Sequence, residues 1–238
     1  NKMDEFSDNH FWYVGRDNIL LSLIDINMND SVERILDYGC GTGELLNNLN
    51  IIYPSKEIHG ADISELAIDY CSSRGLDTVI DLNIDEPKKN YYDLIMCLDV
   101  IEHISDDVEF LYKMRNLLRS GGKLLITVPA YDILWSGEDY VSKHFRRYTR
   151  KILINKINNA GFRINKISYY NFLLFFPLVI VLITKRIFRP RSMYESDIVD
   201  INKLTNRILT WIFSCEKWLL RFMTFPFGGS IICIAKKK

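Results

Sequence analysis

Short runs of consecutive hydrophobic residues alternate along the chain with segments in which hydrophobic residues recur at helical spacing. Continuous apolar runs are typical of parallel strands buried on both faces, whereas a period near 3.6 residues is typical of helices packed on a sheet. The expected strands are one ending near Leu36, followed by 57–62, 77–82, 91–99, 123–129, 162–169 and 229–235. The expected helices are 16–28, 44–50, 64–74, 100–104, 108–118, 149–160 and 202–222. This alternation predicts an α/β fold with a doubly wound, seven-stranded and mostly parallel sheet.

One connection is much longer than a sheet requires. Residues 170–226, here called the insertion, lie between the sixth and seventh expected strands, where a short turn would be enough. We therefore expect a core made of residues 1–169, a helical insertion at 170–226, and a final core strand within 227–238. Connections of this length inside a compact domain usually have a function.

The first half of the insertion is apolar and ends in basic residues. Phe172–Thr184 contains no charge, is interrupted by Pro177, and is followed by Lys185, Arg186, Arg189 and Arg191. Such a segment is too short to span a bilayer, which needs about twenty apolar residues. Three interpretations stay open: a peripheral membrane contact through 172–191, a dimer contact or substrate lid, and an ordinary buried helix.

The second half of the insertion predicts an amphipathic helix. Its apolar stripe consists of Leu204, Ile208, Trp211, Ile212, Cys215, Trp218, Leu219 and Phe222. A stripe of this kind most often faces a protein core. Because two apolar helices in one insertion can bury each other, we expect them to pack as a pair, with membrane contact and homodimerisation as the alternatives.

A glycine-rich loop follows the first strand, with the spacing Asp37-x-Gly39-x-Gly41-x-Gly43. Alternate residues without side chains let the backbone pass close to a ligand, and the N–H groups at the start of the next helix face that ligand. Asp37 lies at the carboxyl end of its strand, where ligands bind in open α/β sheets.

The spacing differs from the dinucleotide fingerprint G-x-G-x-x-G. Counted from Gly39, the sixth position is Glu44, whose negative charge is unfavourable beside a pyrophosphate. This disfavours an oxidoreductase and indicates a ligand without a phosphate.

The loop resembles motif I of the class I S-adenosylmethionine-dependent methyltransferases. The resemblance implies S-adenosylmethionine as cofactor and an antiparallel seventh strand. It also implies that the aromatic N-terminal segment contacts the methionine carboxylate of the cofactor, for which Arg16 is the candidate charge.

Asp62 is the candidate ribose ligand. It ends the second strand about twenty residues after the glycines, the spacing at which an acid binds ribose hydroxyls. The alternative is that Asp62 caps the next helix, a role that Ser64 can also fill. The neighbouring Ile63 is included in the expected cofactor site.

The adenine contacts are expected after the third strand. In the family that the loop resembles, a polar residue there binds the adenine amino group and the next backbone N–H meets the ring, which matches Asn83 and Ile84. Asp81 and Asp85 are the alternatives. Leu98 and Asp99, at the end of the fourth strand, complete the cofactor site.

Asp99, Glu102, His103 and His144 are expected to converge at the carboxyl edge of the sheet. A histidine could accept the proton of a hydroxyl acceptor, so His103, His144 and Glu102 are the catalytic candidates. The set resembles the E-x-x-E-H…H arrangement of ubiquinone-biosynthesis O-methyltransferases and small-RNA 2′-O-methyltransferases. Some of those bind a divalent cation, which is a further candidate ligand here.

The class of the methyl acceptor is inferred from resemblance. The loop 129–135, the segment His144–Arg150 and the apolar insertion resemble methyltransferases of glycan or lipid-linked pathways, which implies a small-molecule, glycan or lipid-linked acceptor. Arg146, Arg147 and Arg150 are candidates to clamp an anionic acceptor, or form a solvated face.

Composition narrows the function further. Thirty basic and thirty acidic residues give no net charge to attract nucleic acid, and no RNA-binding module is visible, although an RNA methyltransferase stays an alternative. No signal peptide is apparent, and five cysteines lack metal-ligand spacing, so we expect a cytoplasmic protein with reduced thiols and at most peripheral membrane association. A catalytically silent binding module on the same fold is the other alternative.

Overall fold

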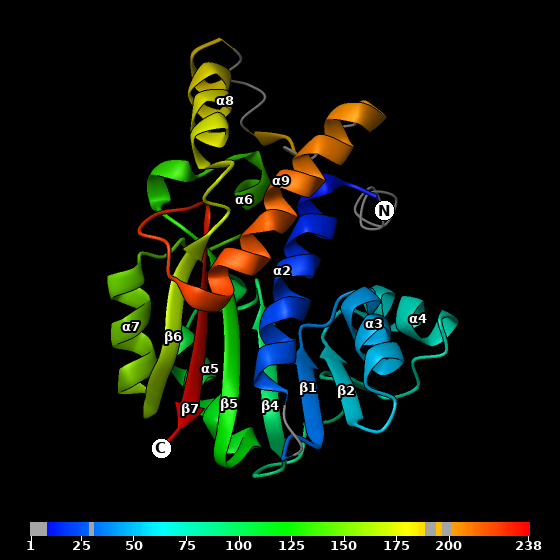
Figure 1. The fold of residues 1–238 in the computed structure, drawn as a ribbon. Helices are drawn as coiled ribbons and strands as arrows, with labels where there is room; N and C mark the ends of the chain where they lie inside the picture. The colour runs from blue at the N-terminus through cyan, green and yellow to red at the C-terminus, as the bar shows by residue number, and fades with distance from the viewer. Residues whose placement is uncertain (1–8, 29–30, 189–193, 197–200) are drawn as a thin grey trace. The chain divides into compact units, whose positions relative to one another are not determined.

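Seven strands form a single sheet in the order β3-β2-β1-β4-β5-β7-β6, which confirms the predicted α/β architecture (Figure 1). The computed structural model describes residues 9–28, 31–188, 194–196 and 201–238, so Arg189 and Arg191 lie outside the described residues. The strands are β1 (Arg34–Tyr38), β2 (Glu57–Asp62), β3 (Val79–Asp81), β4 (Tyr92–Leu98), β5 (Leu118–Pro129), β6 (Phe162–Tyr170) and β7 (Ser230–Lys237).

The strand order reverses between β1 and β4. From β1 the chain moves outward through β2 to β3, then returns to β4 on the other side of β1, and these neighbours are all parallel. Ile35, for example, pairs with Ile58 of β2 and with Leu94 of β4. In Figure 1, β7 runs opposite to β5 and β6. A reversal of this kind opens a crevice at the carboxyl ends of the strands, where ligands of such sheets bind.

Most helices lie where the periodicity predicts them. They are α2 (Phe11–Asn27), α3 (Glu44–Ile52), α4 (Glu65–Ser73), α5 (Asp107–Leu117), α7 (Arg150–Asn159), α8 (Phe175–Phe188) and α9 (Lys203–Phe222). Three short elements complete the set: the 3-10 turns η1 (Ile101–His103) and η2 (Asp132–Leu134), and helix α6 (Gly137–Val141). The last two lie in a stretch that we expected to be loop. Their brevity leaves little periodicity to detect.

Gly121 and Gly122 follow helix α5, between the expected helix 108–118 and the expected strand 123–129. The helix ends at Leu117, and both glycines lie inside β5, where the pairing with β4 shifts register between Tyr92 and Leu94. Glycine in a strand interior often marks such an irregularity.

The chain divides into two compact units. One comprises residues 28–128, 151–167 and 232–238 and contains most of the sheet, with β4 buried along nearly its whole length. The other comprises residues 1–27, 129–150 and 168–231 and therefore joins the N-terminal helix to the insertion.

Helices α2 and α9 pack against each other within the second of these units (Figure 1). Gly15 provides the close approach, because a Cβ there would lie only 2.5 Å from Cδ1 of Phe213. The Asn18 amide donates to Ser214 Oγ at 3.1 Å, and Arg221 Nε donates to Ser22 Oγ at 3.0 Å. Helix α9 thus packs along α2, while the expected packing of the two insertion helices against each other stays a prediction.

The predicted apolar stripe of α9 is not the face that packs. The buried residues of this helix are Phe213, Glu216 and Leu220, whereas Leu204, Ile208, Trp211, Trp218, Leu219 and Phe222 are exposed. The buried face needs few apolar residues because Gly15 admits the large Phe213 ring and hydrogen bonds complete the contact. The more hydrophobic face of α9 therefore points to solvent.

Candidate functional site

The glycine loop is held in a conformation that favours glycine. Gly39, Gly41 and Gly43 have φ values of 80°, 54° and 77°, in the left-handed region that side chains disfavour. The backbone N–H groups of Gly39 and Cys40 donate to the carbonyl of Ala61 at 2.7 and 3.2 Å. The loop after β1 is therefore attached to the end of β2, and the buried Asp37 lies two residues before Gly39.

The three glycines differ in what surrounds them. A Cβ at Gly39 would lie 2.6 Å from Val100 Cγ2, and a Cβ at Gly43 would lie 2.7 Å from both Cys71 Sγ and Leu76 Cδ1. A Cβ at Gly41 would meet nothing within 4 Å. Packing inside the protein therefore explains two of the glycines, while the space beside Gly41 is open to a ligand.

Asp62 connects the loop to the expected sugar position. Its Oδ2 accepts the N–H of Gly41 at 2.9 Å, and its Oδ1 accepts the N–H of Ser64 at 2.9 Å. Ser64 itself caps α4 by accepting from Ala67 N. Because each carboxylate oxygen has two lone pairs, each Asp62 oxygen can still accept one ribose hydroxyl.

The side chain of Asn83 is bound within the protein. Its amide nitrogen donates to Asp81 Oδ1 and to the carbonyl of Ile63, both at 2.9 Å. An adenine amino group needs an acceptor, and Asp81 has a second carboxylate oxygen at the end of β3. Ile63 and Ile84 are exposed beside it, at 70% and 77% of their full areas. The Asn83 amide oxygen is an acceptor as well, so Asn83 and Asp81 both stay candidates for the polar contact, and Ile84 stays the expected ring contact.

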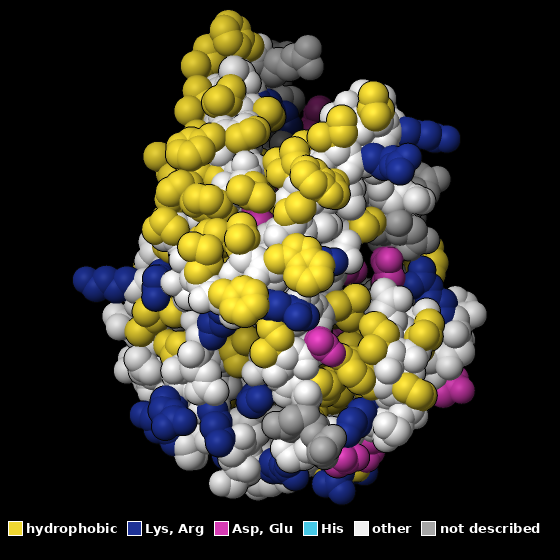
Figure 2. Space-filling model, viewed as in Figure 1, with side chains coloured by type: hydrophobic (Ala, Val, Ile, Leu, Met, Phe, Trp, Pro, Cys, Tyr) yellow, Lys and Arg dark blue, Asp and Glu magenta, His cyan; other side chains and the backbone are white. Residues whose placement is uncertain are grey.

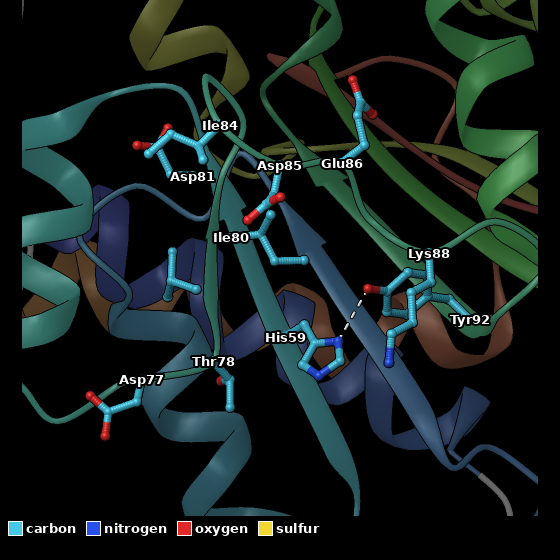
Figure 3. A pocket seen from close by; sticks show the side chains of 11 residues that line it. His59, Asp77, Thr78, Ile80, Asp81, Ile84, Asp85, Glu86, Lys88 and Tyr92 are labelled. Carbon is cyan, nitrogen blue, oxygen red and sulfur yellow. Dashed lines mark hydrogen bonds between the residues drawn. The ribbon is translucent and has the colours of Figure 1, made fainter.

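A groove lies beside these residues on the face of β2 and β3 that carries His59 (Figure 3). It has a volume of about 620 Å³ and is lined by His59, Asp77, Thr78, Val79, Ile80, Asp81, Ile84, Asp85, Glu86, Lys88 and Tyr92. The β3–β4 connection 82–91 forms no helix that would cover this face. Three adenine candidates therefore border open space.

Asp99 occupies an unusual backbone conformation at the end of β4. Its φ is 56°, which is uncommon for any residue other than glycine. The buried Thr127 holds it there: Thr127 Oγ1 donates to Asp99 Oδ1 at 3.0 Å, and the Asp99 N–H lies 3.0 Å from the same hydroxyl and 3.2 Å from the Thr127 carbonyl. Non-glycine residues held in this way cluster at functional sites.

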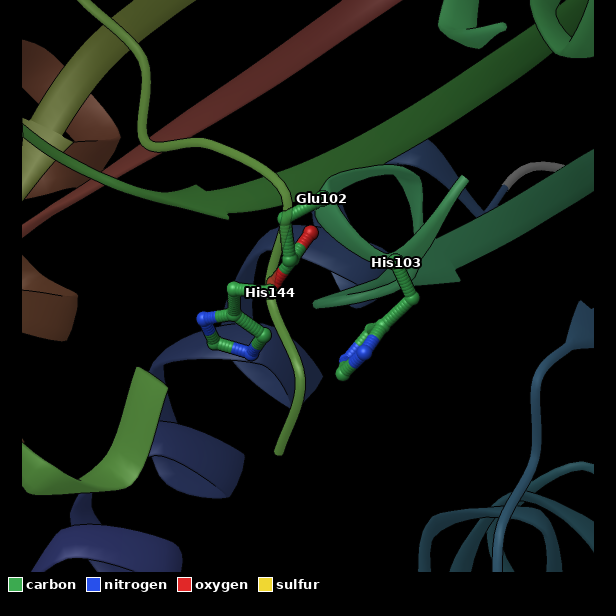
Figure 4. Close-up of side chains that lie close together, drawn as sticks. All are labelled: Glu102, His103 and His144. Carbon is green, nitrogen blue, oxygen red and sulfur yellow. The ribbon is translucent and has the colours of Figure 1, made fainter. Parts of the chain in front are cut away.

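Glu102 and His103 lie on η1, immediately after β4, in the unit that contains the glycine loop (Figure 4). The Glu102 side chain is fully buried, and His103 is exposed. His144 belongs to the other unit. The convergence of these residues, and a cation bound by them, stay predictions.

His144 is bound to a buried carboxylate. Its Nδ1 lies 2.8 Å from Oδ1 of Asp139, and Arg147 donates to both oxygens of the same carboxylate, at 2.8 Å from Nε and 2.7 Å from an Nη atom. Burial raises the pKa of Asp139, but His144 and Arg147 outweigh burial and lower it to about 2. An ionised carboxylate can only accept, so Asp139 favours the tautomer of His144 in which Nδ1 carries the proton.

Two of these residues were not predicted from the sequence. Asp139 orients His144 and Thr127 orients Asp99, and neither has a motif of its own. The guanidinium of Arg147 is bound to Asp139 and to the carbonyl of Ala130 and is therefore not part of a solvated face, while its role as an acceptor clamp stays a prediction. Arg16 lies on α2 beside Asp17 and the Tyr13 ring, and its role at the cofactor stays a prediction.

The reversal in strand order, the open loop at Gly41 and the acid at the end of β2 together define an α/β protein built to bind a nucleoside.

Comparison with known proteins specifies the class. Residues 15–167 match the Methyltransferase domain family. An uncharacterised protein of Methanocaldococcus jannaschii is 34% identical over 51% of this chain, and the ubiquinone biosynthesis O-methyltransferase of a Shewanella strain is 26% identical over 38% of it. The aligned regions cover 34% and 41% of those relatives.

The structure also resembles a SAM-dependent methyltransferase from Archaeoglobus fulgidus. The TM-score is 0.55 at 19% identity, over 92% of this chain and 94% of that one. The chain belongs to the Methyltransferase domain family, within the class I S-adenosylmethionine-dependent methyltransferases.

Proposed function

We propose that the protein transfers a methyl group from S-adenosylmethionine to a hydroxyl group of a small molecule or of a lipid-linked or glycan precursor. The observation that carries the choice of a hydroxyl is the pair Asp139 and His144, in which a buried carboxylate orients an imidazole. A hydroxyl must lose its proton on methylation, and an imidazole in a fixed tautomer can take it.

The residues present fit the cofactor. Gly41 leaves open space where a Cβ would stand, and Asp62 keeps acceptor capacity for two sugar hydroxyls. Glu44, in the first turn of α3, disfavours a phosphate and suits a neutral nucleoside. When bound, S-adenosylmethionine supplies an activated methyl group on a sulfonium.

The protein then has few remaining tasks. Asp62 and the backbone around Gly41 hold the nucleoside. Asp99 is itself held by Thr127 at the end of β4, where it belongs to the expected cofactor site. Nε2 of His144 accepts the acceptor's hydroxyl proton, while Asp139 stabilises the imidazolium that results.

The relatives support oxygen as the methylated atom. The Shewanella relative is a ubiquinone biosynthesis O-methyltransferase, an enzyme that acts on oxygen. The intact loop and the oriented histidine argue against a catalytically silent module, and the balanced charge of the chain argues against RNA as the acceptor.

Methyl transfer from radiolabelled S-adenosylmethionine to matched acceptors tests the proposal. Catechols and total lipid extract provide hydroxyl acceptors, and primary amines of similar size serve as the comparison. We expect labelled product with hydroxyl acceptors and a loss of about 100-fold or more in kcat for His144→Gln, because a general base typically contributes that much.

Cofactor binding separates the possible failures. His144→Gln should bind S-adenosylhomocysteine as the wild type does, in isothermal titration calorimetry. Wild-type activity on amines alone, or full activity of His144→Gln on hydroxyls, would overturn the hydroxyl assignment. Absence of cofactor binding by the wild type would overturn the proposal as a whole.

A further inference from the structure

The outward face of α9 is a continuous stripe of large hydrophobic side chains. Trp211, Trp218 and Phe222 are exposed to 70%, 59% and 91% of their full areas. With Leu204 and Ile208 they are spaced three, four or seven residues apart, so they lie along one side of the helix. Scattered apolar residues on a surface are ordinary, but an exposed stripe five turns long indicates an interaction site.

Helix α8 repeats the pattern. Phe176, Ile180, Ile183 and Ile187 have helical spacing and are all exposed, while Leu182 is buried on the opposite side. The helix is fixed to its own unit, because Arg186 donates to the carbonyls of Ile133 and Trp135 at 2.6 and 2.8 Å. Its apolar stripe is therefore presented to solvent by a fixed element.

Figure 2 shows hydrophobic side chains gathered over both helices on one face of the molecule. The exposed residues of α8 and α9, together with their basic neighbours, are here called the α8–α9 face.

The charged side chains that α8 and α9 expose are all basic, although Arg221 also pairs with Asp25 of α2, 3.6 Å from its carboxylate. Its basic residues are Lys185, Arg186, Lys203, Arg207, Lys217 and Arg221. Within the two helices the only acid is Glu216, which is buried. Lys217 and Arg221 lie over the Trp218 ring, 5.2 and 5.8 Å from its centre, so cations border the apolar stripe directly. A partner that fits must combine an apolar interior with negative charge at its surface.

We propose that the α8–α9 face binds the surface of a lipid bilayer that contains anionic headgroups. Helices that lie in the membrane interface place Trp, Phe and Leu among the acyl chains, and their Lys and Arg residues among the headgroups. Each basic residue near an anionic membrane strengthens the attraction to it. Among the described helices none is long and apolar enough to cross a bilayer.

A second copy of the chain fits this face less well. In a twofold dimer the same patch meets itself. The basic residues of one α9 would then lie near those of the other, with no exposed acid in the two helices to pair with them. Anionic headgroups supply the missing countercharge.

Co-sedimentation of the full chain with vesicles tests the proposal. Phosphatidylcholine vesicles containing phosphatidylglycerol are compared with vesicles of phosphatidylcholine alone. We expect binding to the anionic vesicles that weakens as salt is added, and much weaker binding to the neutral ones. Ile180→Glu on α8 and Trp211→Glu on α9 should each reduce the affinity for anionic vesicles roughly tenfold or more.

Ile51→Glu on α3 is the matched control, because Ile51 is equally exposed, at 69%, but lies outside the face. It should bind vesicles as the wild type does. All three variants should keep the wild-type melting temperature, since the substituted side chains are exposed.

Light scattering after gel filtration, without lipid, tests whether a second copy of the chain binds this face instead. The proposal is overturned if the wild type does not bind anionic vesicles. It is also overturned if Ile51→Glu weakens binding as much as the other two variants, or if the wild type is a stable dimer that Trp211→Glu converts to a monomer.

Discussion

At Gly41 the effect of a side chain on backbone conformation can be separated from its effect on the space for the ligand. It shares a left-handed conformation with Gly75, which follows α4, and a Cβ at either position would meet nothing within 4 Å. Substitution by alanine should therefore cost both sites the same conformational strain, about 1–2 kcal/mol. Only Gly41 lies in the nucleotide loop.

We predict that Gly41→Ala weakens S-adenosylhomocysteine binding at least tenfold, because its methyl group enters the space reserved for the ligand. Gly75→Ala should lose a similar amount of stability and keep the wild-type affinity. Calorimetric titration and urea unfolding measure the two quantities. Equal affinities in the two variants would contradict the assignment of the loop.

Asp139 makes stability depend on pH in the acid range. Its pKa is lowered from 3.8 to about 2 in the folded protein, so ionisation of this carboxylate stabilises the fold above pH 4 by about 2 kcal/mol. This contribution is lost as the pH falls from about 4 towards 2. We predict that Asp139→Asn is less stable than the wild type at pH 7 and that the difference narrows below pH 4 in urea unfolding. A difference that stays constant down to pH 2 would refute the ion pairing.

Residues with a local signature could be predicted from the sequence. Gly39, Gly41, Gly43 and Asp62 lie at fixed distances from the ends of strands, and the structure places them together. Asp139 could not be found in this way, because its partners are defined by the path of a loop and by the buried guanidinium of Arg147. The assignment of Asn83 stays a prediction, and its amide nitrogen donates to Asp81 and Ile63.

Helix α9 carries a buried acid on its packed face. Burial raises the pKa of Glu216 from 4.5 to about 7, although N–H groups of Leu173, Phe172 and Asn171 act in the opposite direction. The folded state therefore binds the proton more tightly than the unfolded chain, and stability falls as the pH rises from about 4.5 through 7.

We predict that Glu216→Gln is more stable than the wild type above pH 7, by about 3 kcal/mol, because the amide needs no ionisation. The two proteins should have similar stabilities below pH 4.5. Urea unfolding across this range measures the difference. A wild type that is as stable as the variant at pH 8 would exclude a buried, ionisable Glu216.

Elements were predictable where hydrophobic burial alone decides them. The strands were found because consecutive apolar residues have few alternatives to a central position in a sheet. The orientation of α9 was not, because the periodicity identifies an apolar face but not what covers it. Here Gly15 on α2 accepts Phe213, and the stripe that should have been core faces outward.

Cofactor binding should raise the thermal stability of the whole chain. Ligands that bind only the folded state stabilise it by about 2.7 kcal/mol at a concentration of 100 times Kd. For a protein of this size we predict a rise in Tm of roughly 5–10 °C with S-adenosylhomocysteine. NAD should give no shift, because Glu44 occupies the position beside a pyrophosphate. Stabilisation by NAD alone, in thermal unfolding followed by circular dichroism, would contradict this prediction and indicate an oxidoreductase.

The hydrogen bonds of Asp62 have a consequence for the energetics of recognition. Its two oxygens already fasten the N–H groups of Gly41 and Ser64. The loop is thus ordered when the chain folds, so nucleoside binding does not carry the entropy cost of ordering it. A preorganised loop can bind with useful affinity through few contacts. This suits a cofactor that must dissociate and be replaced in every catalytic cycle.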